Sequence, residues 1–348
     1  MKKETIPEVV FARFVCALCI VLYHFSCHST SQFKVLYDTS NSGWGNIIVA
    51  AFFVISGIVL SHNYPLEGGW SVEQFYYRRW KSIFPMFYLC YFYFYITITF
   101  KRQHLLFSNI PARSFLLSIL GLDGYFYYKS PNFYIIGEWF LGAIIILYLL
   151  YPLLTMFIRK TNWIAVFCCF LGLFAFVLYD EQYLHLFQIS STRNIISCLV
   201  SFLTGIFIGS KFSIINNNSI IFAISGLVFL LLYVIRVKNE LLYTAVTLLQ
   251  GYTFIIVLMR IGTVIMRSQP VNRIITRISS LTFPIFLFHH KIIEDVLSVY
   301  NPEKPVAVIA LELLTILLTI VSADILAMVV KSITDSKAYQ KIESKVLQ

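Results

Sequence analysis

Residues 9–28 read VVFARFVCALCIVLYHFSCH, an apolar run that contains two basic side chains, Arg13 and His24. Crossing a hydrocarbon core of about 30 Å takes about 20 mostly apolar residues in a helix. Comparable runs recur along the whole chain. With the first, they lie at roughly 9–28, 45–62, 83–100, 134–158, 162–179, 194–210, 219–236, 241–265, 279–299 and 306–330. The sequence therefore predicts an all-α, polytopic transmembrane bundle of about ten spanning helices.

The composition of the 348 residues also indicates a membrane protein. Hydrophobic residues make up 58% and charged residues only 13%, whereas a soluble domain carries about 25% charged residues. The 32 Phe and 22 Tyr suit the aromatic belts of membrane interfaces. The net charge of +10 is explained by basic cytoplasmic loops and anionic lipid, so no nucleic acid partner is expected.

The distribution of Lys and Arg predicts the orientation in the membrane. Placing the N-terminus inside gives the inner segments more of these residues than the outer ones, although Lys101 and Arg102 then fall outside. Both termini are therefore expected in the cytoplasm of a plasma-membrane protein. The first apolar run lacks a small-residue cleavage site after it, so it is expected to remain as an uncleaved helix.

The stretch 105–128 is harder to assign, because Pro111 and the Gly121–Gly124 region interrupt it. We interpret it as an extramembrane or re-entrant excursion, with an eleventh span as the alternative. No separate soluble segment is evident, and we expect a single membrane-embedded domain over residues 1–348.

The first helix carries the most informative polar pair. Arg13 and His24 are eleven residues apart, which is three helical turns, so both side chains project from one face, separated by about 16 Å along the axis. Ionisable groups inside spanning helices are costly and are functional candidates by default. Histidine titrates near neutral pH and can accept a proton from a hydroxyl. We therefore predict a catalytic role for His24, with Arg13 on the same face of the helix.

A catalytic imidazole needs an orienting partner, and Glu138 is the candidate. It precedes Trp139 at the outer start of the fourth predicted span, at a depth similar to that of His24. Two interpretations stay open: Glu138 holds the imidazole, or it is an interfacial carboxylate that faces water. Arg193, at a comparable depth, is a possible ion-pair partner.

A basic stretch at the cytoplasmic start of the third predicted helix contains Arg78, Arg79 and Lys81. It is either a positive-inside anchor or a site for the phosphates of a cytoplasmic donor, since arginine binds phosphate in a bidentate way. Ser56 and Gly57 in the second span are most simply explained by close helix packing, and a catalytic Ser56 is the alternative.

The ninth predicted span places His289 and His290 near its middle. His290 with Glu294, and Lys291 with Asp295, are i,i+4 pairs that are expected to neutralise each other. For the isolated carboxylates Glu312 and Asp324 no role is predicted.

Five short motifs follow one another along the chain: Arg13 with His24, Phe-Phe-Val-Ile-Ser-Gly at 52–57, Tyr77-Arg78-Arg79 with Ile83 and Pro85, Trp139-Phe140-Leu141 with Tyr148 and Pro152, and Phe286-Leu287-Phe288-His289. Together they resemble the acyltransferase 3 family of membrane acyltransferases, over about residues 13–290. The chain departs from that family at two places. In the basic stretch, Lys81 or Ser82 stands where a second Arg is usual, and in the fourth helix Ile144 stands where many members carry Glu. No hydrolase-like SGNH domain is expected.

The resemblance implies transfer of an acyl group, usually acetyl from acetyl-CoA, to a hydroxyl of a cell-surface polysaccharide or lipid-linked sugar. The expected catalytic residues are His24, Arg13 and Glu138, and Arg78, Arg79 and Lys81 are expected to bind the donor. Substrate contacts are expected at Trp139, His289 and Ser56, and no metal is expected. The alternative function is a secondary transporter or flippase for a glycan or lipid-linked precursor, although the paired broken helices typical of transporters are not evident.

Overall fold

The computed structural model describes residues 5–103, 110–136, 139–239 and 242–346. Over these residues the regular elements are helices, which confirms the predicted all-α transmembrane bundle. The α-helices are α1 Pro7–His28, α2 Trp44–Asn63, α3 Val72–Arg102, α4 Phe115–Ile119, α5 Asp123–Phe126, α6 Trp139–Lys160, α7 Trp163–Tyr179, α8 Ile195–Ser210, α9 Phe212–Asn217, α10 Ser219–Val234, α11 Tyr243–Ile265, α12 Gln269–Ser280, α13 Thr282–Val299, α14 Pro305–Thr334 and α15 Lys337–Val346.

A helix occupies each of the ten predicted spans, but the count of ten is not confirmed. Within the described residues, seven helices are long and apolar enough to cross a membrane: α1, α2, α3, α6, α7 with its continuation to Leu184, α11 and α14. The apolar helices α8 and α10 have 16 residues each. In the described part of the 105–128 excursion, α4 and α5 have five and four residues. Neither is long enough to span a membrane.

The helices form two compact units. Unit 1 contains residues 1–69 and 150–279, and unit 2 contains residues 70–149 and 280–348. Helix α6 contributes its first half to unit 2 and its second half to unit 1. This division follows contacts within the chain, and the expectation of one membrane-embedded domain over 1–348 stays a prediction.

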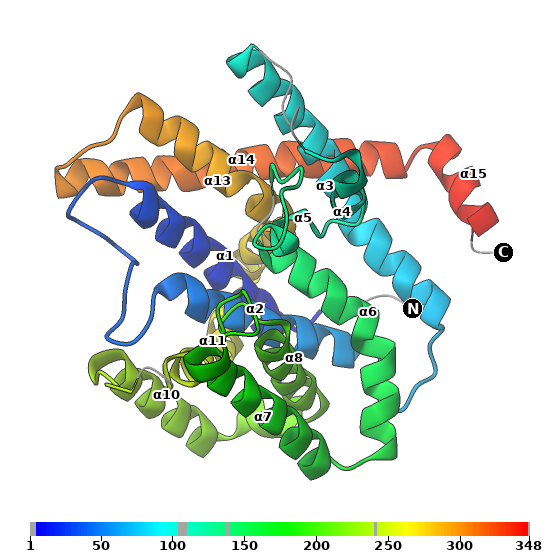
Figure 1. The fold of residues 1–348 in the computed structure, drawn as a ribbon, viewed down its shortest axis with the longest axis vertical. Coiled ribbons are helices and arrows are strands. Elements are labelled where there is room, and N and C mark those ends of the chain that lie inside the picture. Colours follow the sequence, from blue (N-terminus) through cyan, green and yellow to red (C-terminus); the bar gives the residue numbers. More distant parts are fainter. Residues whose placement is uncertain (1–4, 104–109, 137–138, 240–241, 347–348) are drawn as a thin grey trace. The chain divides into compact units, whose positions relative to one another are not determined.

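Helix α2 is the centre of unit 1, where α1, α8 and α11 all pack against it (Figure 1). Its residues Ile47, Ile48, Val54 and Ile58 are fully buried. A helix that is apolar on all sides packs in this way inside a bundle. Helices α7 and α10 lie further out, against α8 and α11 respectively.

Glycines let α2 and α8 approach at backbone distance. A Cβ atom on Gly57 of α2 would lie 2.2 Å from the carbonyl oxygen of Phe202, and one on Gly205 of α8 would lie 2.1 Å from that of Val54. Small residues at such crossings allow close van der Waals packing of membrane helices. The packing interpretation of the Ser56–Gly57 motif therefore has direct structural support.

Replacing Gly57 by alanine is expected to lower the thermal stability of the protein in detergent, because the new methyl group meets backbone atoms that cannot move aside. Overpacking of this kind costs about 1–3 kcal/mol. The matched control is Gly172→Ala in α7, where a Cβ meets nothing within 4 Å. There the better helix propensity of alanine is expected to keep or slightly raise stability. Equal melting temperatures for the two variants would contradict the close approach of α2 and α8.

In unit 2, α3 packs against both α13 and α14, and α13 and α14 lie side by side as a hairpin (Figure 1). The ring of Phe94 on α3 meets that of Phe288 on α13 at a centroid distance of 5.4 Å. Lys101 at the end of α3 binds Asp295 of α13 at 2.7 Å, and Lys291 binds Glu294 within α13 at 2.8 Å. The predicted Lys291–Asp295 pair is therefore wrong, because a tertiary partner takes the Asp295 carboxylate.

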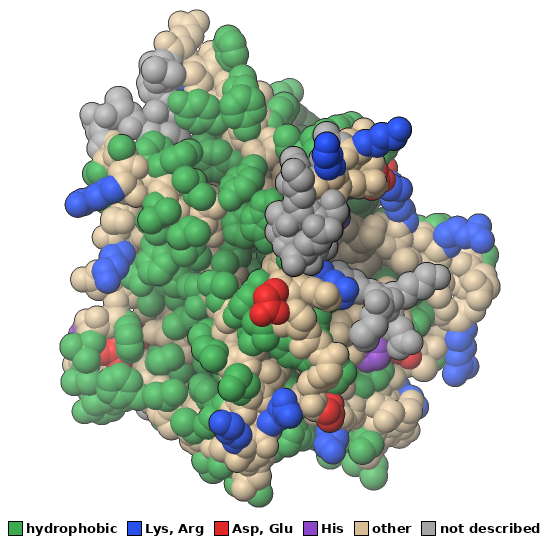
Figure 2. Space-filling view, turned by 90° about the vertical axis from the view of Figure 1, so that its right-hand side faces the viewer, with side chains coloured by type: hydrophobic (Ala, Val, Ile, Leu, Met, Phe, Trp, Pro, Cys, Tyr) green, Lys and Arg blue, Asp and Glu red, His purple; other side chains and the backbone are tan. Residues whose placement is uncertain are grey.

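Large apolar side chains remain exposed on the outer helices of each unit, as lipid contact requires. Ile164 of α7 and Val234 of α10 in unit 1 are 76% and 71% exposed, and Leu313 of α14 in unit 2 is 62% exposed. Figure 2 shows such hydrophobic side chains spread over much of one face of the molecule. A soluble monomer rarely exposes an apolar surface of this extent.

Asp123 is a buried carboxyl in the excursion between α3 and α6, outside the spanning helices. It is 1% exposed, and its backbone carbonyl accepts a hydrogen bond from the Asn132 amide at 2.8 Å. Burial raises the pKa of Asp123 to about 6. The folded protein therefore binds this proton more tightly than the unfolded chain does. The resulting stabilisation is complete below the ordinary pKa of aspartate and is lost as the pH rises through about 6.

Asp123→Asn is expected to raise the melting temperature at pH 7.5, because the neutral amide avoids the cost of a buried charge. A pKa raised by about two units corresponds to about 3 kcal/mol. The difference between variant and parent is expected to shrink as the pH falls below 6. Asp335→Asn removes an exposed carboxylate and serves as the control, with no shift expected. A gain that is the same at pH 7.5 and pH 5 would contradict the raised pKa.

Candidate active site

Helix α1 holds Arg13 and His24 in one unbroken helix, as the sequence predicts. Both side chains are partly buried, while Ala17 and Ile20, at intermediate positions on the same face, are buried. The helix packs against α2 and α11. Arg13 and His24 therefore lie on a face of α1 that is at least partly buried along its length.

The end of α1 that carries His24 is fixed by its neighbours in unit 1. The Tyr23 ring lies edge-on to the His24 imidazole at a centroid distance of 5.1 Å. Gly45 at the start of α2 makes room for that ring, since a Cβ there would lie 2.2 Å from Tyr23 Cε1. Lys34 donates from Nζ to the carbonyl oxygens of Ser26 and Ser29, each at 2.6 Å. A cation at a helix C-terminus stabilises its last turn, and here that turn follows His24 directly.

The basic stretch lies near the start of α3, which begins at Val72. Arg79 turns toward α6: its guanidinium lies over the Tyr148 ring at 5.7 Å and over the Phe75 ring at 6.0 Å. Arginine stacks favourably on aromatic faces in this way. The structure thus brings together Arg79 and Tyr148, from two separate sequence motifs.

Lys81 faces a different neighbour, the C-terminal helix α15. Its Nζ donates to both carboxylate oxygens of Glu343, at 2.7 and 2.9 Å, and lies over the Tyr339 ring at 5.4 Å. The hydrogen bond from Lys81 holds the pKa of Glu343 below its usual range. The predicted basic cluster is therefore divided, with Arg79 directed to α6 and Lys81 to α15. No motif indicated Glu343, since it lies outside all five.

The start of α6 and the middle of α13 meet in unit 2. Phe140, next to Trp139, packs edge-on against Phe286 at a ring distance of 5.6 Å, and Phe286 lies 6.0 Å from the His289 ring. Trp139 itself is the first residue of α6 and is partly buried. Two further motifs are thereby joined, the Trp-Phe-Leu segment and the Phe-Leu-Phe-His segment.

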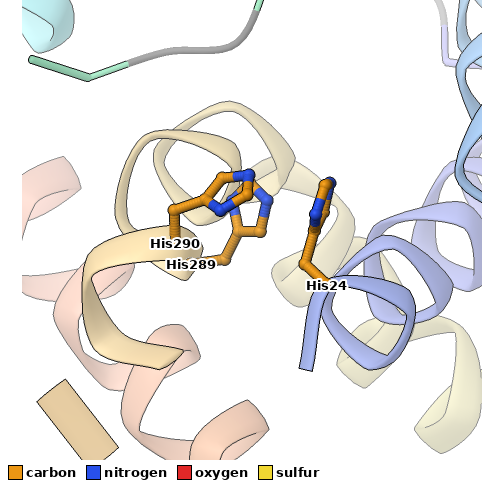
Figure 3. Close-up of side chains that lie close together, drawn as sticks. All are labelled: His24, His289 and His290. Carbon is orange, nitrogen blue, oxygen red and sulfur yellow. The ribbon is translucent and has the colours of Figure 1, made fainter. Parts of the chain in front are cut away.

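His289 is fully buried, and its Nδ1 lies 2.8 Å from the carbonyl oxygen of Phe286. A carbonyl only accepts, so Nδ1 carries the proton and Nε2 is the basic nitrogen of the neutral ring. The His290 ring lies 4.4 Å away on the same helix. Figure 3 shows this pair of imidazoles on α13, and also His24 on α1.

The other residues that the sequence singled out lie in different parts of the fold. Glu138 lies outside the described residues. Ser56 is partly buried on α2, beside the glycine that contacts α8. Arg193 is exposed in the turn before α8. Ile144, where many relatives of the resembled family carry Glu, is buried in α6.

Comparison with known proteins adds an independent line of argument. The family model described as an acyltransferase domain matches residues 6–328, a range that contains all five motifs. No curated protein and no solved structure matches the chain. The match covers most of the chain and agrees with the polytopic helical fold. This chain belongs to the acyltransferase 3 family, and it is a membrane acyltransferase.

Proposed function

We propose that the protein transfers an acetyl or other short acyl group from acyl-CoA to a hydroxyl of a cell-surface polysaccharide or lipid-linked sugar. The observation that carries this proposal is the face of α1, where Arg13 and His24 project from one continuous helix in a chain of this family. In the reaction, His24 accepts the proton of the attacking hydroxyl. The oxygen then bonds to the acyl carbon as the bond from that carbon to the sulfur of CoA breaks. The leaving thiolate takes up a proton, and His24 gives up the proton that it accepted.

Arg13 has an electrostatic part in this proposal. It is a permanent cation on the same face as His24, three turns away. A cation there favours an anionic donor at its end of the helix. Glu138 remains the proposed orienting carboxylate for His24.

Arg78 and Arg79 are proposed to bind the phosphates of the donor, with Lys81 beside them. Arg78 and Arg79 are partly buried, and the aromatic contacts of Arg79 limit the freedom of its guanidinium. Preorganised arginines lose less entropy when they bind a phosphate. On the acceptor side, Trp139, Ser56 and His289 are proposed substrate contacts. The protein would lie in the plasma membrane, surrounded by lipid, with both termini in the cytoplasm.

The proposal is tested with membrane vesicles that contain the protein and CoA donor labelled either in the acetyl group or in the adenine. We expect the acetyl label, and not the adenine label, to enter a glycan or lipid-linked fraction and to be released by mild alkali, as an ester is. Vesicles without the protein are the control. Movement of glycan across the membrane with no donor present, and without label transfer, would contradict the proposal in favour of a transporter.

A further inference from the structure

The contact between Glu343 and Lys81 has a consequence for donor binding. Lys81 is one of three cations proposed to bind the donor, and the structure places a carboxylate on it with both oxygens within hydrogen-bond distance. The Tyr77 hydroxyl, one turn earlier on α3, interacts with the same carboxylate. Glu343 thus takes the position on Lys81 that an anionic donor group would take.

We propose that α15 is a C-terminal latch on the donor site, in which Glu343 competes with a phosphate of acyl-CoA for Lys81. This inference rests on the proposed function and adds a form of regulation to the same site. When the donor binds, its phosphate replaces the Glu343 carboxylate on Lys81, and α15 is released from α3. No covalent bond changes in this exchange.

The ion pair has the properties of a contact that can be exchanged. The Lys81 side chain is 34% exposed and the Glu343 side chain is 22% exposed, so water reaches both groups. Ion pairs with this access to solvent contribute little free energy. A phosphate carries more negative charge than a carboxylate and offers more acceptor oxygens, so it competes effectively for the same ammonium group.

The charge pattern of the C-terminal segment supports the same inference. Residues 337–348 contain three lysines, Lys337, Lys341 and Lys345, and a single acidic residue, Glu343. Glu343 binds Lys81, which is 262 residues away in the sequence, although Lys341 and Lys345 are only two residues away along the chain. Tyr339, one turn before Glu343, covers the same ammonium group with its ring. Two side chains of α15 therefore converge on Lys81.

The latch is tested by the dissociation constants of two ligands, measured with the full-length protein in lipid nanodiscs. CoA carries phosphates, and pantetheine is the same thiol without the nucleotide and its phosphates. Glu343→Gln is expected to tighten CoA binding about threefold to fivefold, the size expected for loss of an exposed ion pair. Binding of pantetheine is expected to stay unchanged, because it has no phosphate to compete for Lys81.

Asp335→Asn is the matched control. It removes the same charge from an exposed position just before α15, and it should leave both dissociation constants unchanged. The latch is overturned if Glu343→Gln leaves CoA binding unchanged, or if it alters CoA and pantetheine binding equally. Failure of the proposed function gives a different result, namely no measurable CoA binding or acetyl transfer by the parent protein itself.

Discussion

His24→Ala is expected to abolish acetyl transfer in membrane vesicles while the protein still inserts. Removing a general base lowers a rate about 10²- to 10⁴-fold. The loss should appear in kcat, because the donor is proposed to bind at α3 in unit 2, through residues that this variant leaves intact. The measurement is transfer of labelled acetyl at saturating donor, normalised to the amount of inserted protein.

His28→Ala provides the control for this experiment. His28 is the last residue of the same helix, one turn beyond His24, and it is exposed. We expect His28→Ala to retain transfer. His24→Gln should be as inactive as His24→Ala, because an amide forms hydrogen bonds but does not accept a proton at neutral pH. Full transfer by either His24 variant would rule out His24 as the base.

Arg79→Ala is expected to raise the KM for acetyl-CoA strongly and to change kcat little. A hydrogen bond between a charged group and a phosphate contributes about 1.5–3 kcal/mol, which corresponds to about 10- to 100-fold in affinity. Arg79→Lys should lie between the parent and the alanine variant. It keeps a cation over the Tyr148 ring but loses the bidentate geometry that phosphate favours.

The control for the Arg79 variants is Arg113→Ala. Arg113 is an exposed arginine of unit 2 in the short turn before α4, and its removal should leave the KM unchanged. If Arg79→Ala instead left the KM untouched and only reduced membrane insertion, the basic stretch would be a topological anchor. The donor site would then have to be sought elsewhere.

The start of the third span was predicted wrongly, although a local sequence pattern marks it. The apolar-run criterion started the third span at 83, because Arg78, Arg79 and Lys81 interrupt the hydropathy. The helix begins earlier, at Val72, where the Ser71 side chain accepts a hydrogen bond from the Gln74 backbone at 3.1 Å. Ser followed three residues later by Gln is a capping-box pattern. This pattern places the start of the helix at Val72.

Side-chain partners on other helices, by contrast, leave no signal in the local sequence. The i,i+4 spacing of Lys291 and Asp295 is a sound rule for an isolated helix, yet Asp295 binds Lys101 of α3 instead. Lys81 likewise binds Glu343 of α15, and Arg79 lies over Tyr148 of α6 as well as over Phe75 of its own helix. Such partners depend on which helices pack together, and hydropathy carries no information about that choice.

The sequence by itself determined the membrane class, the approximate places of the apolar helices and the shared face of Arg13 and His24. These properties follow from the hydrophobic run length and the helical period, which are local. Only the tertiary structure decided that Gly57 and Gly205 bring α2 and α8 into backbone contact, that Arg79 lies on Tyr148, and that Glu343 lies on Lys81. Those contacts join residues far apart in the chain, and the physical reason is that helix packing, rather than helix formation, selects them.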